Sequence, residues 1–375
     1  MKKKKLEKKK RTTVRERDWE ANHEQAFSHD LVRHRRALSK LSETARATAN
    51  AALPADFTPN ATLISHSKKW AFVQTDAAGD AEASDLICLI DERLHEGDES
   101  LLAPGDRVFI EFEEDDAFVR GVAPRRTTLS RPAGEHDRIR RQVIAANIDL
   151  IVVVAAAAQP PFRPGLVDRF LIAAEIGGVE SVLCLNKADL TDGEPAELQI
   201  YRDLGMRVCV TSCMDGRGLA ELREMLSGRF SVFAGHSGVG KSSLLNTLDP
   251  ALRVHTQEVS NQTLRGRHTT TASRLYELAG NVRVIDTPGI RTLGLWRVTP
   301  AESAYYFPEF AEAVWDCKYR NCTHTHEPGC AVKLAVAGGR IKESRYASYC
   351  RVRASLESED NITPGRVKPI EEKLL

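Results

Sequence analysis

The stretch Gly235-His-Ser-Gly-Val-Gly-Lys-Ser-Ser243 decides the fold of this chain. It has the spacing of a phosphate-binding loop, in which the glycines let backbone N–H groups approach phosphate oxygens closely. The apolar residues 230–234 before it predict a buried strand, and residues 241–248 after it predict a helix with leucines on one side. A strand, a glycine loop and a helix in this order predict a bound nucleoside triphosphate.

The positions of this loop have expected roles in holding the nucleotide. Lys241 is expected to reach the β- and γ-phosphates, and Ser242 to supply a hydroxyl to Mg²⁺, a hard cation that prefers oxygen ligands. A glycine-rich turn without a ligand is the alternative, and the flanking elements argue against it. The expected contacts with the nucleotide come from Gly235, His236, Ser237, Gly238, Val239, Gly240, Lys241, Ser242 and Ser243.

The composition is that of a soluble multidomain protein. Its 375 residues are enough for two or three domains, and a hydrophobic fraction of 42% fills ordinary cores. The net charge is only +1, so any affinity for nucleic acid must come from where the charges lie. No apolar run is long enough for an export signal or a membrane span. Eight cysteines in such a chain predict a reducing cytoplasm and no disulfide framework.

Changes in composition and hydrophobic pattern along the chain predict six regions. Residues 1–56 form a basic, helical extension, for which a disordered solubilising tail is the alternative. Residues 57–124 form a small β-barrel, of the oligonucleotide-binding (OB) type or SH3-like. Its five short β-like runs are 61–65, 70–75, 86–90, 107–112 and 117–122. The other regions are a basic connector at 125–147, an α/β domain at 148–295, a small α-helical metal-binding domain at 296–356 and a disordered tail at 357–375.

A second motif, Asn186-Lys-Ala-Asp189, follows the buried strand expected at 179–185. The Asp189 carboxylate can accept hydrogen bonds from N1–H and from the exocyclic amine of guanine, and adenine lacks both donors. Lys187 is expected to lie along the base, and Asn186 to hydrogen-bond the base and tie neighbouring loops together. Alone, the motif could be a turn with a capping aspartate. Beside a phosphate loop, it predicts GTP rather than ATP.

Three further segments complete the expected nucleotide site. At the next strand end, Ser212 and Cys213 are expected to contact the base, Cys213 through its backbone N–H. Asp286-Thr-Pro-Gly289 supplies a carboxylate for the Mg²⁺ shell and a glycine N–H that senses the γ-phosphate. In Gly266-Arg-His-Thr-Thr-Thr271, a threonine completes the Mg²⁺ shell only when the γ-phosphate is present. Thr270 is the first choice, with its neighbours left open. The alternative role of these threonines is structural: a β-prone run that begins the next strand.

The order of these motifs is unusual. The base-reading segments precede the phosphate loop, whereas ordinary GTPases have the loop first. The same parallel sheet forms if the old termini are joined and new ones opened elsewhere, since termini tend to lie close together. The sequence therefore predicts a circularly permuted P-loop GTPase domain.

A cysteine cluster near the C-terminus has the spacing of a metal site. Cys317, Cys322, His324 and Cys330 offer three thiolates and one imidazole in a short segment, which predicts one tetrahedral Zn²⁺ per chain. His326 is a rival ligand. Positive charge around the cluster suits RNA phosphate, with a solvated charged face as the alternative. The basic residues are Lys318, Arg320, Lys333, Arg340, Lys342, Arg345, Arg351 and Arg353.

With barrel, permuted GTPase and zinc knuckle in this order, the chain resembles the ribosome small-subunit-dependent GTPase A family over about residues 57 to 355. The residues that carry the resemblance are 104–108 (PGDRV), 146–149 (ANID), 167–169 (VDR), 186–189, 235–243, 266–271, 286–289 and the cysteine cluster. The long basic start departs from the family pattern.

The resemblance implies an OB barrel, binding of ribosomal RNA, and GTP hydrolysis that the small ribosomal subunit stimulates and that is coupled to release from it. It further implies that His268 orients the attacking water, because Ile290 occupies the position where many GTPases have a glutamine. We expect a monomeric cytoplasmic protein that cycles between GTP and GDP and makes no membrane contact. The rival hypotheses are a non-hydrolysing GTP-responsive RNA-binding scaffold and a P-loop small-molecule kinase.

Overall fold

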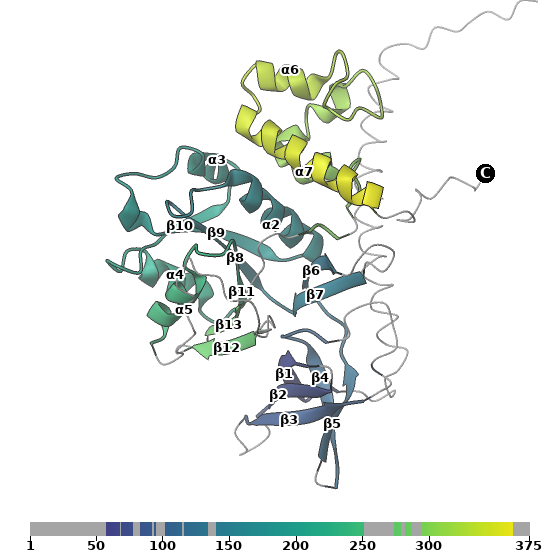
Figure 1. The fold of residues 1–375 in the computed structure, drawn as a ribbon, viewed down its shortest axis with the longest axis vertical. Helices are drawn as coiled ribbons and strands as arrows, with labels where there is room; N and C mark the ends of the chain where they lie inside the picture. The colour runs from purple at the N-terminus through teal and green to yellow at the C-terminus, as the bar shows by residue number, and fades with distance from the viewer. Residues whose placement is uncertain are drawn as a thin grey trace, which may run out of the picture. The chain divides into compact units, whose positions relative to one another are not determined.

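Figure 1 shows a computed structural model of the chain. The chain divides into two compact units, Met1–Ala51 and Ala52–Leu375. The first unit lies outside the described residues, so the expected helical extension does too. The structure describes residues 58–67, 69–77, 83–91, 94, 102–114, 116–133, 140–250, 274–278, 282–286, 294–296 and 298–362. Within these ranges, no helix combines the length and apolar character needed to cross a membrane.

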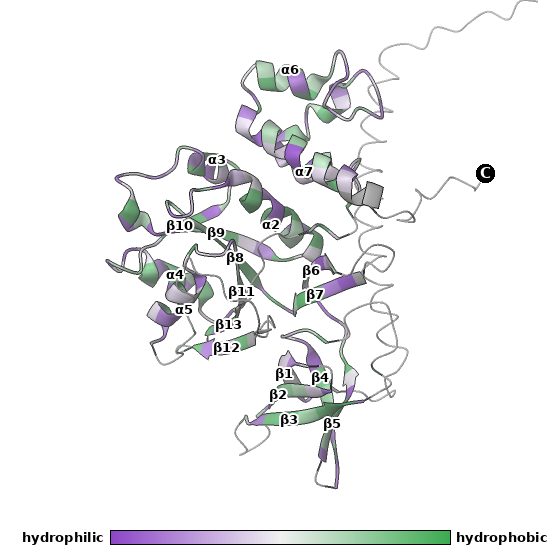
Figure 2. Cartoon of the chain, viewed as in Figure 1, coloured by the Kyte–Doolittle hydropathy of each residue, from purple (hydrophilic) through white to green (hydrophobic). Residues whose placement is uncertain are grey.

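Five strands close into the expected barrel, in the order β1-β2-β3-β5-β4. Neighbours are antiparallel except β3 and β5, which run parallel. Alternate residues such as Leu63, Val73 and Val119 fill the interior and are fully buried. The hydrophobic colour of β3 reflects apolar residues on both of its faces (Figure 2). The strands are β1 (Ala61–His66), β2 (Trp70–Thr75), β3 (Asp85–Ile90), β4 (Arg107–Glu113) and β5 (Asp116–Val122).

The basic connector contains a hairpin that the sequence interpretation missed. Strands β6 (Thr128–Ala133) and β7 (Arg140–Ala146) pair antiparallel. Leu129 and Ala145 are fully buried, while Arg131 and Arg141 hydrogen-bond to polar side chains of the partner strand. The many arginines in this segment obscured the alternation of buried and exposed positions in its sequence. Two of the arginines of the connector therefore have partners within the hairpin.

A six-stranded sheet forms the centre of the expected α/β domain, in the order β10-β9-β8-β11-β13-β12. All pairs are parallel except β12 with β13. The strands are β8 (Leu150–Ala156), β9 (Glu180–Asn186), β10 (Arg207–Val210), β11 (Phe230–Ala234), β12 (Arg274–Leu278) and β13 (Val282–Asp286). The helices are α2 (Pro164–Gly177), α3 (Leu198–Asp203), α4 (Leu219–Leu226) and α5 (Lys241–Leu248).

Helices cover both faces of this sheet, which explains why its central strands are apolar throughout. Every residue of β8 is buried. Ile151 belongs to one core with Phe170 of α2, and Val152 belongs to the other with Leu245 of α5. Burying each such side chain contributes roughly 1.5–3 kcal/mol. The carboxyl ends of the parallel strands are thereby fixed at one edge.

The C-terminal part is helical, as expected. It has three short 3₁₀ helices, Ser303–Tyr306, Pro308–Phe310 and Val314–Asp316, followed by α6 (Ala331–Ala337) and α7 (Glu343–Ile362). Phe307, Phe310 and Tyr349 pack together in its core, with Tyr349 edge-on to both phenylalanines and ring centroids 5.0 Å apart for Phe310 and Tyr349. Helix α7 continues to Ile362, past residue 356 where we expected the tail to begin.

A buried ionic cluster joins α7 to α2. The Arg345 guanidinium forms ion pairs with Asp168 of α2 and with Glu309. Tyr201 donates a hydrogen bond of 2.9 Å to Asp168, and Ser348 donates another. Only 5% of the Arg345 side chain is exposed, so our expectation that it adds surface charge around the cysteine cluster was wrong. Its charge forms ion pairs within the chain.

We expect Arg345→Ala to destabilise this junction strongly. Removing the guanidinium leaves two carboxylates in a buried site without a counter-charge, which typically costs about 3–5 kcal/mol. Denaturant unfolding followed by tryptophan fluorescence should show an earlier transition. Arg340→Ala, which removes an exposed arginine between α6 and α7, is the matched control and should stay within about 0.5 kcal/mol of the parent. Equal unfolding midpoints for the two variants would contradict the prediction.

Candidate nucleotide-binding site and metal centre

The phosphate loop connects β11 to α5, as its sequence predicts. Gly235 has a φ of +152°, and a Cβ there would lie 2.2 Å from the Val154 carbonyl oxygen. Gly240 has a φ of +95°, and a Cβ there would lie 2.3 Å from Nδ2 of Asn186. Both positions therefore require glycine, for backbone conformation and for space. The second contact shows that the phosphate loop and the base-reading segment touch.

The lysine and serines of the loop lie at the start of α5. The Lys241 ammonium donates hydrogen bonds to the carbonyl oxygens of Gly235 and His236, at 2.9 and 3.0 Å. Ser242 and Ser243 follow in the first turn and are partly exposed. Ser237 is the most exposed of the loop positions between Gly235 and Ser243, whereas Val239 is buried. The loop thus presents its lysine and hydroxyl groups at one helix end.

The base-reading residues converge from the ends of β9 and β10. Ser212 donates a hydrogen bond of 2.6 Å to the Asp189 carboxylate. Asn186 is buried and donates to the Val239 carbonyl at 3.0 Å, which ties it to the phosphate loop. Lys187 donates to the carbonyl of Gln159. Residues expected at one site from separate motifs are therefore in contact.

Ser212 and Cys213 form the turn beyond β10. Ser212 Oγ also accepts hydrogen bonds from the backbone N–H groups of Met214 and Asp215, at 3.1 and 3.3 Å. Burial raises the pKa of the Cys213 thiol, so this side chain is neutral. A neutral thiol is compatible with the expected contact through the backbone N–H of Cys213.

The switch residues are only partly within the described ranges. The backbone of Asp286 ends β13, opposite Phe233 of β11. It therefore lies at the same sheet edge as the phosphate loop. His268, Thr270 and Gly289 lie outside the described residues.

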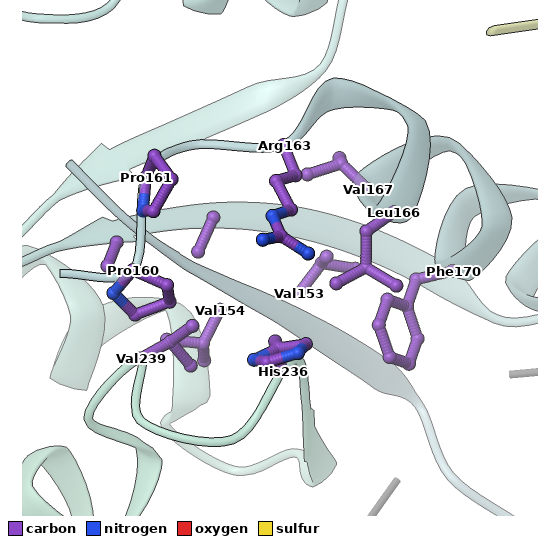
Figure 3. Close-up of a pocket in the computed structure, with 12 residues that line it drawn as sticks. Val153, Val154, Pro160, Pro161, Arg163, Leu166, Val167, Phe170, His236 and Val239 are labelled. Atoms are coloured by element: carbon purple, nitrogen blue, oxygen red, sulfur yellow. The ribbon is translucent and has the colours of Figure 1, made fainter. Parts of the chain in front are cut away.

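A loop that the sequence interpretation missed lies against the phosphate loop. Residues 157–163 follow β8, and Pro160 lies 3.8 Å from the position of a Cβ on Gly238. Figure 3 shows Pro160, Arg163 and His236 around a small cavity beside this loop. Its volume is about 20 Å³, room for about one water molecule. The two consecutive prolines, Pro160 and Pro161, were the signal available in the sequence.

The cysteine cluster is brought together as its spacing predicts. The ligand atoms of Cys317, Cys322, His324 and Cys330 lie within 4.8 Å of one another. His324 is buried, and burial lowers its pKa, which keeps the imidazole neutral for binding a cation. The rival His326 is 81% exposed at its side chain and faces Glu327 instead. Among the described residues, His324 is therefore the histidine placed to complete the set.

The spacing of these atoms fits a tetrahedral metal site. The sulfurs of Cys317 and Cys330 are 3.9 Å apart, and His324 Nδ1 is 3.4 and 3.5 Å from them. Bonds of about 2.3 Å to sulfur and about 2.0 Å to nitrogen give tetrahedral edges of about 3.8 and 3.5 Å. Soft thiolates favour Zn²⁺ over hard cations. Cys317, His324 and Cys330 are thus already spaced as a tetrahedral metal site requires, and Cys322 lies within 4.8 Å of them.

The fold and the site together define a circularly permuted P-loop GTPase that carries an OB-like barrel and a cysteine-rich helical region. A model of the RsgA GTPase family matches residues 122–296. The chain belongs to this family and is a GTP hydrolase.

Relatives and solved structures support this family membership. The small ribosomal subunit biogenesis GTPase RsgA of Chlorobaculum parvum is 42% identical over 268 residues, which cover 69% of this chain and 86% of that protein. The protein of the same name from Moorella thermoacetica is 42% identical, over 67% of this chain and 83% of its own length. The crystal structure of YjeQ from Thermotoga maritima is 30% identical, with a TM-score of 0.61, and matches 80% of this chain and 98% of that chain. YloQ, described as a circularly permuted GTPase, has a TM-score of 0.57 and is 29% identical over 81% of this chain and 96% of that chain.

Proposed function

We propose that this protein binds the small ribosomal subunit during its late maturation, that the subunit stimulates GTP hydrolysis, and that hydrolysis releases the protein. The observation that carries the proposal is the contact between the base-reading and phosphate loops in a chain that also has an OB-like barrel and a cysteine cluster. The relatives named small ribosomal subunit biogenesis GTPases support it. The protein acts as a monomer in the cytoplasm.

Each motif has a role in this proposal. The backbone of the phosphate loop, from Gly235 to Ser243, binds the phosphates, with Lys241 on the β- and γ-phosphates. Asp189 reads guanine, with help from Asn186, Lys187 and the turn at Ser212 and Cys213. Ser242, Thr270 and Asp286 hold Mg²⁺ directly or through water, and Gly289 senses the γ-phosphate. The cysteine cluster holds one Zn²⁺, which fixes the shape of an RNA-binding surface.

Turnover with and without purified small subunits tests the proposal. We expect GTP hydrolysis to be slow alone and faster on the subunit. Binding to the subunit, measured by sedimentation, should be tighter with a non-hydrolysable GTP analogue than with GDP, because the switches order around the γ-phosphate. No stimulation, together with equal affinities in the two nucleotide states, would refute the subunit role. That result would leave the assignment of GTP hydrolysis unchanged.

We expect His268→Ala to keep GTP and subunit binding and to lower subunit-stimulated turnover on the order of 10²-fold, the low end for a lost general base or water-orienting group. A neutral imidazole can accept a hydrogen bond from the attacking water, which Ile290 cannot. Single-turnover phosphate release on saturating subunits measures the effect. His255→Ala changes a histidine with no assigned role and is the matched control. If His268→Ala hydrolyses GTP on the subunit at the parental rate, another group holds the water.

A further inference from the structure

A basic groove lies where the start of α2 meets α7. It has a volume of about 420 Å³ and is lined by three arginines, Arg163, Arg169 and Arg351, with apolar walls that include Phe162 and Val352. No carboxylate is among its described lining residues. The arginines come from segments far apart in the sequence, so the groove exists only in the folded chain.

The arginines of this groove are placed to receive a ligand. Arg169 donates a hydrogen bond of 3.0 Å to Ser355, which orients its guanidinium across the two helices. Arg163 and Arg351 are exposed, and neither has an ion-pair partner in the part of the chain that the structure describes. A Cβ on Gly165 would lie 3.2 Å from Nε and Nη2 of Arg351. The absence of a side chain at Gly165 therefore leaves room for this guanidinium against the first turn of α2.

We propose that this groove binds phosphate groups of an RNA backbone. Guanidinium groups bind phosphate through paired hydrogen bonds, and arginine contacts with phosphate supply much of the affinity for nucleic acids. The groove is larger than a single phosphate needs, and its apolar walls suit the sugars between successive phosphates. The inference rests on the proposed function, because the RNA is that of the small subunit.

The groove also has a structural connection to the nucleotide site. Arg163 lines both the groove and the small cavity beside His236 (Figure 3). The loop that carries Arg163 contacts the phosphate loop through Pro160 and receives the hydrogen bond from Lys187. RNA in the groove would therefore touch an element that contacts both nucleotide-binding loops.

Salt-dependent binding of arginine variants tests the inference. We expect Arg163→Gln and Arg351→Gln each to weaken binding to purified small subunits about tenfold and to lower the slope of log affinity against log salt concentration by about one. Gly165→Leu keeps every charge but displaces the Arg351 guanidinium, and should weaken binding in the same way. Arg207→Gln, an exposed arginine on β10, is the matched control and should bind as the parent does. GTP affinity and unfolding midpoints should be unchanged in Arg351→Gln and Arg207→Gln.

The same measurements with other probes identify the ligand. Protein-free small-subunit RNA should show the same dependence on Arg163 and Arg351, and millimolar inorganic phosphate should not compete. Arginine dependence seen only with intact subunits would indicate an acidic protein partner and overturn the inference, as would efficient competition by inorganic phosphate. If the parent binds subunits and every variant keeps the parental affinity and salt slope, the groove inference is overturned and the proposed function is not. A parent that binds no subunits would refute the proposed function instead.

Discussion

Replacing Cys322 with serine is expected to release the bound metal and unfold the segment between Cys317 and Cys330. Structural zinc sites in small domains contribute on the order of 10 kcal/mol at neutral pH, more than the whole stability of many domains. The segment contains no regular helix or strand, and apart from the cluster it is held by hydrogen bonds such as those that Tyr346 and Tyr349 donate to the carbonyls of His324 and Thr323. Metal analysis of the purified variant should find less than one zinc per chain, and near-ultraviolet circular dichroism should show loss of the C-terminal aromatic packing.

The choice of histidine supplies the control for this prediction. His326→Ala should keep the parental zinc stoichiometry, since the His326 side chain is 81% exposed and lies beside Glu327. His324→Ala should lose affinity for zinc, because its Nδ1 lies within 3.5 Å of two of the sulfurs. If Cys322→Ser retains one zinc per chain and the parental unfolding curve, the cluster is not a structural metal site.

The second large effect is expected from Asp189→Asn, which should lower the affinity for GTP by about 10³-fold. An amide accepts one hydrogen bond from guanine, but its NH₂ group faces the exocyclic amine and repels it. Xanthine has a carbonyl at that position, to which the amide can donate. The variant should therefore gain affinity for xanthosine triphosphate. Ser212 can still donate to the amide oxygen, so the turn should keep its position.

Titration with fluorescent GTP and xanthosine triphosphate analogues measures this exchange. Asp192→Asn makes the same chemical change at an exposed position three residues further on and should leave both affinities unchanged. Parental affinity for GTP in Asp189→Asn would remove the base-reading assignment from this residue.

Local spacing in the sequence was sufficient for much of the fold and of the candidate site. The phosphate loop, the base-reading motif and the cysteine cluster each consist of residues close together in the chain, with chemistry that needs that spacing. The five barrel strands were predicted within one residue at each end, because alternation of buried and exposed residues is also a local property. The order of the motifs predicted the circular permutation, which the similarity to YloQ supports.

The tertiary structure alone decided the contacts between distant segments. The spacing favoured His324 but left His326 as a rival, because the choice depends on which imidazole the fold places beside the sulfurs. The sequence interpretation placed Arg345 at the surface, but the fold buries this arginine between Asp168 and Glu309. The groove is likewise formed by α2 and α7 together. Periodicity reports which face of an element is buried, and it carries no information on which distant side chain lies opposite.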